Sequence, residues 1–354
     1  MTQFKKPRSK TVFEAFSLLN AKKMNKITLT IIFMSVIFTL ATQSSSATMR
    51  EEADRFLQSM PDSLQDKQTA AILQAIEGDN SLLQVVRNSR NTPSPLPNNV
   101  IAEYVNSKAC LYRPVGIEDP LPLLIYFHGG GWTFGSINSC SRFCANTASS
   151  GKAMVLAIDY PLAPEHPFPE GLTYCVNAVE ETFTKATEWG IDSNAIILGG
   201  DSSGGNLAIA TALQLIDRLG YCPIKSLLLF YPVVKAFSDD SDSWNRYGKG
   251  FALDSGIMDA FNKAYTKDSL NPLVSVALAP DSVLKKLPRT VIVAAERDIL
   301  HDQGLEFFKH LKELGVGTQR ITLPGTVHLF ITVKGQEQAF QQAVKLTSKL
   351  MEEL

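Results

Sequence analysis

The sequence lacks an excess of charge of either sign. It has 34 lysine and arginine residues against 35 aspartate and glutamate residues, which gives a formal net charge of −1. A protein that holds nucleic acid by its phosphates needs a basic surface, and a balanced composition does not supply one. The composition therefore excludes nucleic-acid binding as the main function.

Cysteine is scarce, and its spacing does not predict a metal site. The five cysteines are Cys110, Cys140, Cys144, Cys175 and Cys222. Cys140 and Cys144 are simply one helical turn apart. An exported chain could pair some of these thiols, but an odd number leaves at least one free. The sequence favours small buried side chains over a disulfide framework.

One long apolar run stands near the N-terminus. It covers residues 27–41, follows Lys22, Lys23 and Lys26, and precedes small polar residues that end at Ala47. This order is typical of a secretory signal peptide with cleavage after Ala47. The run has about fifteen residues, whereas a helix that spans a bilayer needs roughly twenty. Export is therefore favoured over an uncleaved anchor.

The predicted leader sets the expected location of the protein. Cleavage implies a periplasmic or secreted protein, whereas an uncleaved segment implies a membrane-anchored one. We expect contact with a membrane only in the second case. Met24 is an alternative start to Met1, because residues 1–23 make an unusually long basic leader.

Beyond residue 101, short apolar runs alternate with helical patterns. The chain has 354 residues, of which 45% are hydrophobic, so it can bury a large core. Unbroken apolar runs separated by helices predict parallel strands that are buried on both faces. We expect strands at 121–127, 154–158, 195–198, 227–231, 290–295 and about 319–323, and helices at 140–149, 171–185, 206–219, 302–314 and 335–352. This pattern predicts an α/β protein with an open, mostly parallel, doubly wound sheet.

Two segments do not fit this alternation. Residues 50–99 carry amphipathic pieces that prolines interrupt, and residues 235–271 are rich in aromatic side chains. We expect both segments to form a helical cap over the sheet. The predicted organisation is a leader or anchor at 1–47, N-terminal cap helices at 48–100, and a sheet domain at 101–354 with a cap insertion at about 235–271.

The segment between the third predicted strand and the following helix reads G-D-S-S-G, residues 200–204. A glycine-rich turn at this place also binds phosphate or merely closes a loop. As G-x-S-x-G it is typical of a nucleophile elbow, in which the central residue, Ser202, is strained and exposed above the sheet. A side chain at Gly200 or Gly204 would collide with the neighbouring helix or strand. The N–H group of Ser203 would face developing negative charge.

A second glycine-rich segment favours the nucleophile elbow. The sequence FHGGGW, residues 127–132, directly follows a predicted strand and leaves amides that no side chain shields. Bare N–H groups at such a point stabilise the oxyanion of an acyl-transfer intermediate. We expect Gly130, Gly131 and Ser203 to be the donors, with Gly129 as the less favoured one.

A serine nucleophile needs a base, and the chain offers few candidates. The five histidines are His128, His166, His301, His310 and His328. The first belongs to the glycine loop and is expected to hold it by hydrogen bonds; the second lies in a proline-rich turn, and the next two lie on a helix. His328 follows the last predicted strand on the sheet edge expected for Ser202, so we take it as the base.

The acid must lie between Ser202 and His328 in the chain order of this architecture. Asp298 directly follows a predicted strand and is our candidate. Glu296 lies nearer the strand, and Asp302 is better placed to cap the following helix. In the predicted roles Ser202 attacks, His328 takes and returns the proton, and Asp298 orients His328.

Five segments between about residues 100 and 335 occur in a recognisable order: HGGGW, DYPLAPEHPFPE, GDSSGGNLA, ERDILHDQG and VHLF. In these segments the chain resembles the hormone-sensitive-lipase family of α/β-hydrolase esterases. The resemblance implies the α/β-hydrolase fold, hydrolysis of carboxylic esters with short to medium acyl chains, and no metal or organic cofactor. It places the triad on Ser202, Asp298 and His328 and the oxyanion hole on Gly130, Gly131 and Ser203.

The chain departs from the family pattern at two positions. Ser203 stands where alanine is commoner, and Pro161 stands where arginine is usual. Neither departure touches a catalytic group. The first 47 residues lie outside the resemblance, so the expected location rests on the leader alone.

Some alternatives stay open at this stage. A ligand-binding protein without catalysis is the second functional class, because plant gibberellin receptors resemble the family but lack the catalytic histidine; His328 favours catalysis. An amidase or a thioesterase would use the same groups. We expect a small-molecule ester substrate and a monomer or homodimer. Trp132 either binds substrate in an acyl pocket or packs under the cap.

Overall fold

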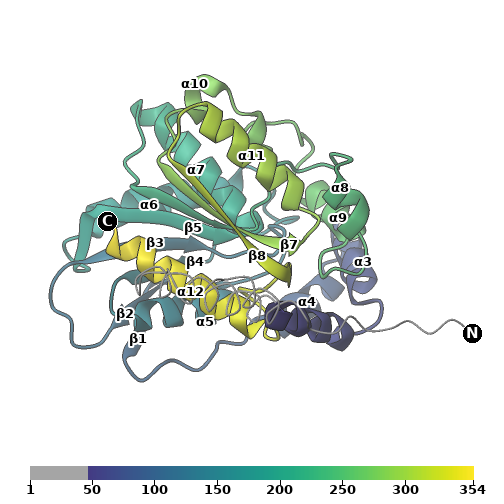
Figure 1. Ribbon diagram of the computed structural model, residues 1–354, viewed down its shortest axis with the longest axis horizontal. Coiled ribbons are helices and arrows are strands. Elements are labelled where there is room, and N and C mark those ends of the chain that lie inside the picture. Colours follow the sequence, from purple (N-terminus) through teal and green to yellow (C-terminus); the bar gives the residue numbers. More distant parts are fainter. Residues whose placement is uncertain (1–46) are drawn as a thin grey trace, which may run out of the picture. The chain divides into compact units, whose positions relative to one another are not determined.

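The apolar runs of the sequence form one eight-stranded sheet in the computed structural model, which describes residues 47–354 (Figure 1). The strands are β1 (Val100–Asn106), β2 (Ala109–Pro114), β3 (Leu121–Phe127), β4 (Met154–Ile158), β5 (Ile191–Asp201), β6 (Ser226–Phe230), β7 (Arg289–Arg297) and β8 (Thr318–Val327). Their spatial order is β1-β2-β4-β3-β5-β6-β7-β8. The pairs β1–β2 and β2–β4 are antiparallel and all the others are parallel, which confirms the predicted fold class.

The predicted leader lies outside the described residues, except for Ala47 itself. Its cleavage therefore stays a prediction. Among residues 47–354, no helix combines the length and the apolarity that crossing a membrane requires.

The central strands are buried on both faces, as their apolar runs predict. Every residue of β4 and β6 is buried, and so are the last five residues of β3. Strands β3 and β4 have the predicted bounds, whereas β5 and β8 extend beyond them in both directions. The extensions carry polar residues, which an apolar run does not mark.

The hairpin of β1 and β2 is not among the predicted strands. Strand β1 lies at the edge of the sheet, and two of its large side chains, Ile101 and Tyr104, are 53% and 58% exposed. An edge strand with one solvated face does not carry a continuous apolar run. A rule that searches for such runs therefore misses it.

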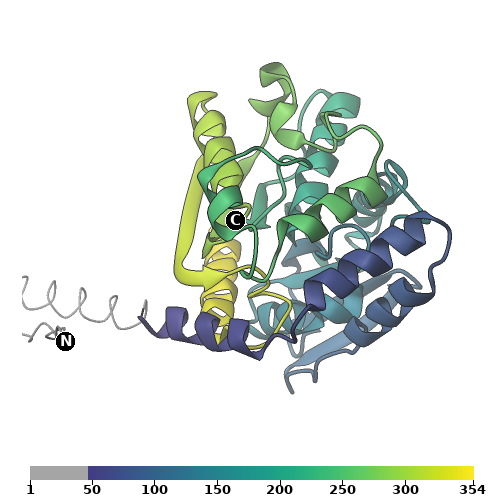
Figure 2. The same ribbon diagram turned by 90° about the vertical axis from the view of Figure 1, so that its right-hand side faces the viewer.

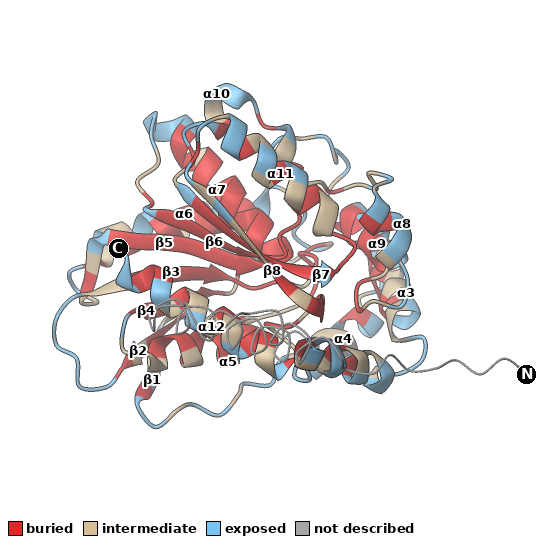
Figure 3. Cartoon of the chain, in the orientation of Figure 1, coloured by how far each residue is buried: buried red, intermediate tan, exposed pale blue. Residues whose placement is uncertain are grey.

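Helices cover both faces of the sheet. They are α5 (Ile137–Ser149) and α12 (Glu337–Glu352) on one face, and α6 (Glu170–Lys185), α7 (Ser203–Leu219) and α11 (His301–Glu313) on the other (Figure 1). The short helices η1 (Val276–Leu278) and α10 (Asp281–Leu284) lead into β7. The buried sides of the helices face the sheet, as expected for a doubly wound fold (Figure 3).

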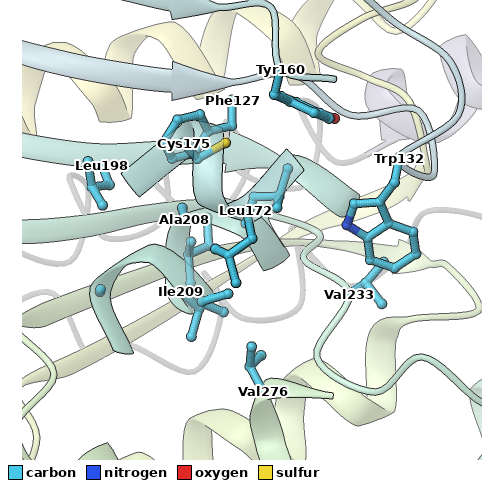
Figure 4. Close-up of a cluster of buried hydrophobic side chains, with 14 of the residues drawn as sticks. Phe127, Trp132, Tyr160, Leu172, Cys175, Leu198, Ala208, Ile209, Val233 and Val276 are labelled. Atoms are coloured by element: carbon cyan, nitrogen blue, oxygen red, sulfur yellow. The ribbon is translucent and has the colours of Figure 1, made fainter. Parts of the chain in front are cut away.

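The core on the α7 side holds the elbow segment in place. Phe127 and Leu198 of the sheet belong to one buried cluster with Cys175 of α6 and with Ala208 and Ile209 of α7 (Figure 4). Truncation of a large, fully buried side chain of this kind costs about 2–5 kcal/mol. The packing therefore fixes α7 against β3 and β5, and with it the turn that joins β5 to α7. The five cysteines are unpaired thiols, four of them buried.

The two segments outside the α/β alternation lie side by side. The N-terminal one contains α3 (Leu64–Ile76) and α4 (Ser81–Arg90), and the later one contains α8 (Asp242–Tyr247) and α9 (Ser255–Tyr265). Helix α3 contacts both α4 and α9, at one end of the sheet (Figures 1 and 2). Residues 47–354 form one compact unit, so the boundary between cap and sheet domain at residue 100 stays a prediction.

A helix at residues 47–59 is attached to the end of β7, to the loop that follows β8 and to the start of α12. Asp54 Oδ1 accepts a 2.6 Å hydrogen bond from Arg297 Nη1, and Glu52 Oε2 accepts one of 2.8 Å from the N–H of Gln338. Phe56 is 7% exposed and packs against Gly335, where a Cβ would lie 3.0 Å from its ring. This helix therefore stabilises the C-terminal part of the sheet domain.

We predict that a chain starting at Pro61 is less stable than one starting at Thr48. The loss in the free energy of unfolding should reach at least about 2 kcal/mol, because burial of one phenylalanine side chain contributes about 1.5–3 kcal/mol. Urea unfolding of the two purified chains measures this difference. Equal transition midpoints would contradict the prediction.

Candidate active site

A sharp turn joins β5, which ends at Asp201, to α7, which begins at Ser203. Ser202 lies between them with φ 55° and ψ −118°, a positive-φ conformation that residues with a side chain rarely adopt. Such a conformation is strained by about 1–3 kcal/mol and persists only because its surroundings hold it. The predicted strain at Ser202 is thus present.

The two glycines of the elbow are needed because the backbone comes close to other backbone there. A Cβ on Gly200 would overlap Gly204, and a Cβ on Gly204 would overlap the carbonyl oxygen of Phe127. Neither obstacle is a flexible side chain that could move away. The predicted reason for the glycines is therefore confirmed.

The structure brings Ser202, His328 and Asp298 into one hydrogen-bonded chain. His328 Nε2 lies 3.1 Å from Ser202 Oγ, and His328 Nδ1 lies 2.6 Å from Asp298 Oδ2. Both His328 and Asp298 are 1% exposed. The second oxygen of Asp298 accepts a 3.0 Å bond from the N–H of Leu300, which fixes the carboxylate. A carboxylate, imidazole and hydroxyl in this order make a serine oxygen nucleophilic.

The two alternative acids, Glu296 and Asp302, make no hydrogen bond with His328. The carboxylate of Glu296 accepts the N–H of Gly325. Asp302 Oδ2 accepts a 2.8 Å bond from the N–H of Ser243 in the insertion. Asp302 does not cap α11, because this helix already begins at His301, so that expectation is wrong. Its partner Ser243 lies 59 positions earlier in the chain, so no local pattern indicates the contact.

Two residues that the sequence did not single out hold His328. The ring of Tyr231 packs on the imidazole at 4.3 Å between centroids. Gln336 Nε2 donates to the carbonyls of Val327 and His328, at 3.1 and 3.0 Å, and its Oε1 accepts the N–H of Val327 at 2.9 Å. Gln336 thus closes the loop that carries His328. No local signal marks it, because its partners lie eight and nine positions earlier in the chain.

Asp201 holds the glycine loop beside the elbow. Its Oδ1 accepts bonds from the hydroxyl of Tyr126 at 2.8 Å and from the N–H of Gly129 at 3.0 Å. Burial raises the pKa of this carboxyl, and the hydrogen bond from Tyr126 opposes that effect. The N–H group of Gly129 is therefore already occupied, in keeping with its lower rank among the candidate donors.

Gly130 and Gly131 face the same cavity as Ser202 and His328. Both have positive φ values, 116° and 60°, and a Cβ on Gly131 would overlap the ring of Phe261. Among the hydrogen bonds of residues 47–354, none uses the N–H of either glycine. Ser203 is the first residue of α7, so its N–H has no carbonyl partner in the preceding turn of the helix.

His128 supports the glycine loop and does not reach Ser202 in any hydrogen bond. Its Nδ1 lies 2.9 Å from the carbonyl oxygen of Gly129, and its ring stacks on Tyr160 at 4.4 Å. The hydroxyl of Tyr160 donates to the carbonyl of His128 at 2.7 Å. The predicted hydrogen-bonding role of His128 is therefore present.

A cavity of about 530 Å³ opens above Ser202. Apolar side chains from the N-terminal segment and from the insertion form much of its wall, among them Phe56, Met60, Leu64, Leu253, Ile257 and Phe261. Volumes of this order suit a small organic ligand.

Trp132 does not belong to the residues that line this cavity. It is 1% exposed and stacks on Tyr265 with centroids 4.3 Å apart and planes at 2° (Figure 4 shows its place in the buried cluster). Tyr265 is the last residue of α9. Of the two roles considered for Trp132, its surroundings support packing under the cap.

Comparisons with known proteins agree with this geometry. A family model described as the alpha/beta hydrolase fold matches residues 124–332. The chain is 32% identical to a putative alpha/beta hydrolase of Acanthamoeba polyphaga mimivirus, over 72% of this chain and 73% of the relative. It is 35% identical to an arylesterase of Saccharolobus solfataricus, over 68% of this chain and 79% of the relative.

Among solved structures, a thermostable esterase from Pseudomonas putida has a similar fold. The two structures superpose with a TM-score of 0.73 at 23% sequence identity, covering 86% of this chain and 96% of the other. This likeness extends the agreement from the sequence to the three-dimensional arrangement of the chain.

We predict that Gln336→Met slows the reaction of Ser202 with a fluorophosphonate probe by about tenfold or more. Loss of partners for buried polar groups costs about 1–3 kcal/mol and frees the loop of His328. The measurement is the rate of covalent labelling at Ser202, followed by mass spectrometry. Gln341→Met, on the exposed side of α12, which begins directly after Gln336, is the control. An unchanged rate in a folded Gln336→Met protein would show that the loop does not need this side chain.

Proposed function

The chain belongs to the α/β hydrolase family, as its resemblance to the hormone-sensitive-lipase esterases predicts, and from this premise we propose that it hydrolyses carboxylic esters with Ser202 as nucleophile. The observation that carries the proposal is the hydrogen-bonded chain from Ser202 through His328 to Asp298, at the floor of a cavity. The names of the archaeal relative, an arylesterase, and of the Pseudomonas putida esterase support esters as the substrate class.

In the proposed mechanism, Ser202 Oγ attacks the ester carbonyl while His328 Nε2 takes its proton. The C–O bond to the alcohol then breaks, His328 returns the proton to the leaving alcohol, and an acyl group stays on Ser202. Water attacks this acyl-enzyme in the same way, with His328 again as base, and releases the acid. Asp298 orients the imidazole and stabilises its charged form.

The negative oxygen that forms in each half-reaction needs hydrogen-bond donors. We propose the N–H groups of Gly130, Gly131 and Ser203, which have no hydrogen-bond partner within residues 47–354, as those donors. Removal of one donor of this kind raises the barrier of acyl transfer by about 2.7–4 kcal/mol. The positive end of the α7 dipole lies at the same point.

The size of the cavity supports esters with short to medium acyl chains. Its volume is about 530 Å³, in the lower half of the range for small-molecule sites. The apolar wall favours an alkyl or aryl part on the ester. The preference for short to medium acyl chains is part of the proposal.

We predict that activity towards 4-nitrophenyl esters, tested from acetate to palmitate, peaks at short to medium chains. Ser202→Ala should lower kcat/KM by at least about 10⁴-fold and abolish labelling by a fluorophosphonate. Ser203→Ala, which removes the neighbouring hydroxyl but keeps the backbone N–H, should retain both. A folded protein without turnover and without labelling would favour a ligand-binding protein instead.

We also propose that the protein is exported through residues 1–47, because three lysines precede the apolar run. The expected result in a secreting host is a mature chain that begins at Thr48, measured by mass spectrometry of the N-terminal peptide. Recovery of the full chain in the membrane fraction would indicate an anchor. That the protein is a monomer or a homodimer stays a prediction.

A further inference from the structure

The cavity above Ser202 has a polar wall as well as an apolar one. This polar wall is formed by the end of α4, the residues after it, and the start of α5: Ser89, Arg90, Thr92, Ser94, Asn138 and Ser139. An enzyme for purely apolar esters has no need of such a wall. The polar wall is therefore a candidate for recognition of a second group on the substrate.

Arg90 is the charged residue of the polar wall, and the described residues offer it no hydrogen-bond or ion-pair partner. Among residues 47–354, no hydrogen bond or ion pair uses its guanidinium, which lies over the ring of Phe134 at 5.1 Å from the centroid. The side chain is partly buried, and burial lowers the pKa of its guanidinium. A guanidinium has five N–H donors. Those of Arg90 are not among the fully buried polar atoms, so they remain accessible to a ligand in the cavity.

Arg87, three residues earlier on the same helix, has the opposite surroundings. Its guanidinium binds both oxygens of Glu165, at 2.6 and 2.8 Å, and the carbonyls of Ala163 and Thr133 at 2.9 and 2.8 Å. Helix α4 therefore carries one arginine that anchors it to the domain and one that faces the cavity without a counterion.

The other charges on the cavity wall do not neutralise Arg90. The carboxylate on the wall is that of Asp201, which already accepts bonds from Tyr126 and Gly129. Two further cations line the cavity, Arg142 and Lys334. Arg142 pairs with Glu337 at 2.5 Å, and the charge of Lys334 acts on the same carboxylate. Arg142 and Lys334 thus both act on the carboxylate of Glu337, whereas residues 47–354 offer no carboxylate to Arg90.

The backbone that carries Arg90 is tied to the neighbouring helix. Asn91 Oδ1 accepts bonds from Ser136 Oγ at 2.8 Å and from Asn138 Nδ2 at 2.9 Å, which ties the end of α4 to the start of α5. The ring of Phe134 under the guanidinium packs edge-on against Phe261 at 5.3 Å. Because the backbone is held in this way, binding of an anion has to order the Arg90 side chain but not the helix end.

We propose that Arg90 binds a carboxylate on the substrate, so that the preferred esters are half-esters of dicarboxylic acids, with the ester at Ser202 and the free carboxylate at Arg90. This inference rests on the proposed esterase function. The planar guanidinium matches a carboxylate with two parallel hydrogen bonds. A carboxylate on the substrate supplies the counterion that residues 47–354 do not give to Arg90.

Two esters of the same shape test the proposal. One is mono-4-nitrophenyl adipate; the other is 4-nitrophenyl 6-methylheptanoate, in which an isopropyl group replaces the carboxylate. We expect the protein to prefer the adipate in kcat/KM, after subtraction of the enzyme-free rate. Arg90→Met should lower that preference by about 10- to 100-fold, the factor that corresponds to the hydrogen bonds of one charged group. Arg218→Met, an exposed arginine outside the cavity, should leave the preference unchanged.

The two esters also separate the two proposals. If neither ester is hydrolysed, the esterase function fails. If the neutral ester is hydrolysed but the adipate is not preferred, or if Arg90→Met lowers both rates equally, the carboxylate site is overturned and the esterase function stands.

Binding without turnover gives a second measurement. Adipate should raise the melting temperature of Ser202→Ala, and this rise should disappear when Arg90→Met is added. The melting curve of the double variant without adipate reports whether it is folded. An equal rise in both folded variants would overturn the role of Arg90.

Discussion

The active site depends on one close approach of backbone, between the first turn of α7 and the carboxyl end of β3. At Gly204 a Cβ would overlap the carbonyl oxygen of Phe127, so a larger residue would push helix and strand apart. The glycine loop begins directly after Phe127. This approach therefore brings the free amides of that loop to the N-terminus of α7, beside Ser202. The same close approach therefore positions both the nucleophile and the proposed oxyanion donors.

The parallel order of the central strands places Asp298 and His328, the two residues to which Ser202 is linked by hydrogen bonds. Strand β7 ends one residue before Asp298, and β8 ends one residue before His328. Because parallel strands present their carboxyl ends at the same edge, both side chains emerge near Ser202. The sheet alone does not orient the imidazole, however. Gln336 and Tyr231 do this by holding the backbone and the ring of His328.

These two levels explain what the sequence could predict. Ser202, Asp298 and His328 each follow an apolar run at a strand end, so a local pattern and the chain order were enough to bring them together. Gln336 acts through a loop that has no periodicity. Arg90 and Arg87 are equivalent in any local pattern, because they stand three residues apart on one helix; only the tertiary contact with Glu165 distinguishes them. Edge strand β1 was not predicted, because it is buried on one face only and so carries no continuous apolar run.

The walls of the cavity are built separately from its floor, and this bears on selectivity. Gln65 joins α3 to the insertion, with Nε2 donating to the carbonyl of Ala252 at 2.5 Å. The wall contact of Gln65 shares no residue with the contact between Ser202 and His328, so we expect the walls to set substrate preference and the floor to set the chemistry. Arg87 holds the end of α4 through four hydrogen bonds. These bonds keep the helix end, and with it Arg90, at the cavity wall, where an entering anion is the partner that its guanidinium lacks.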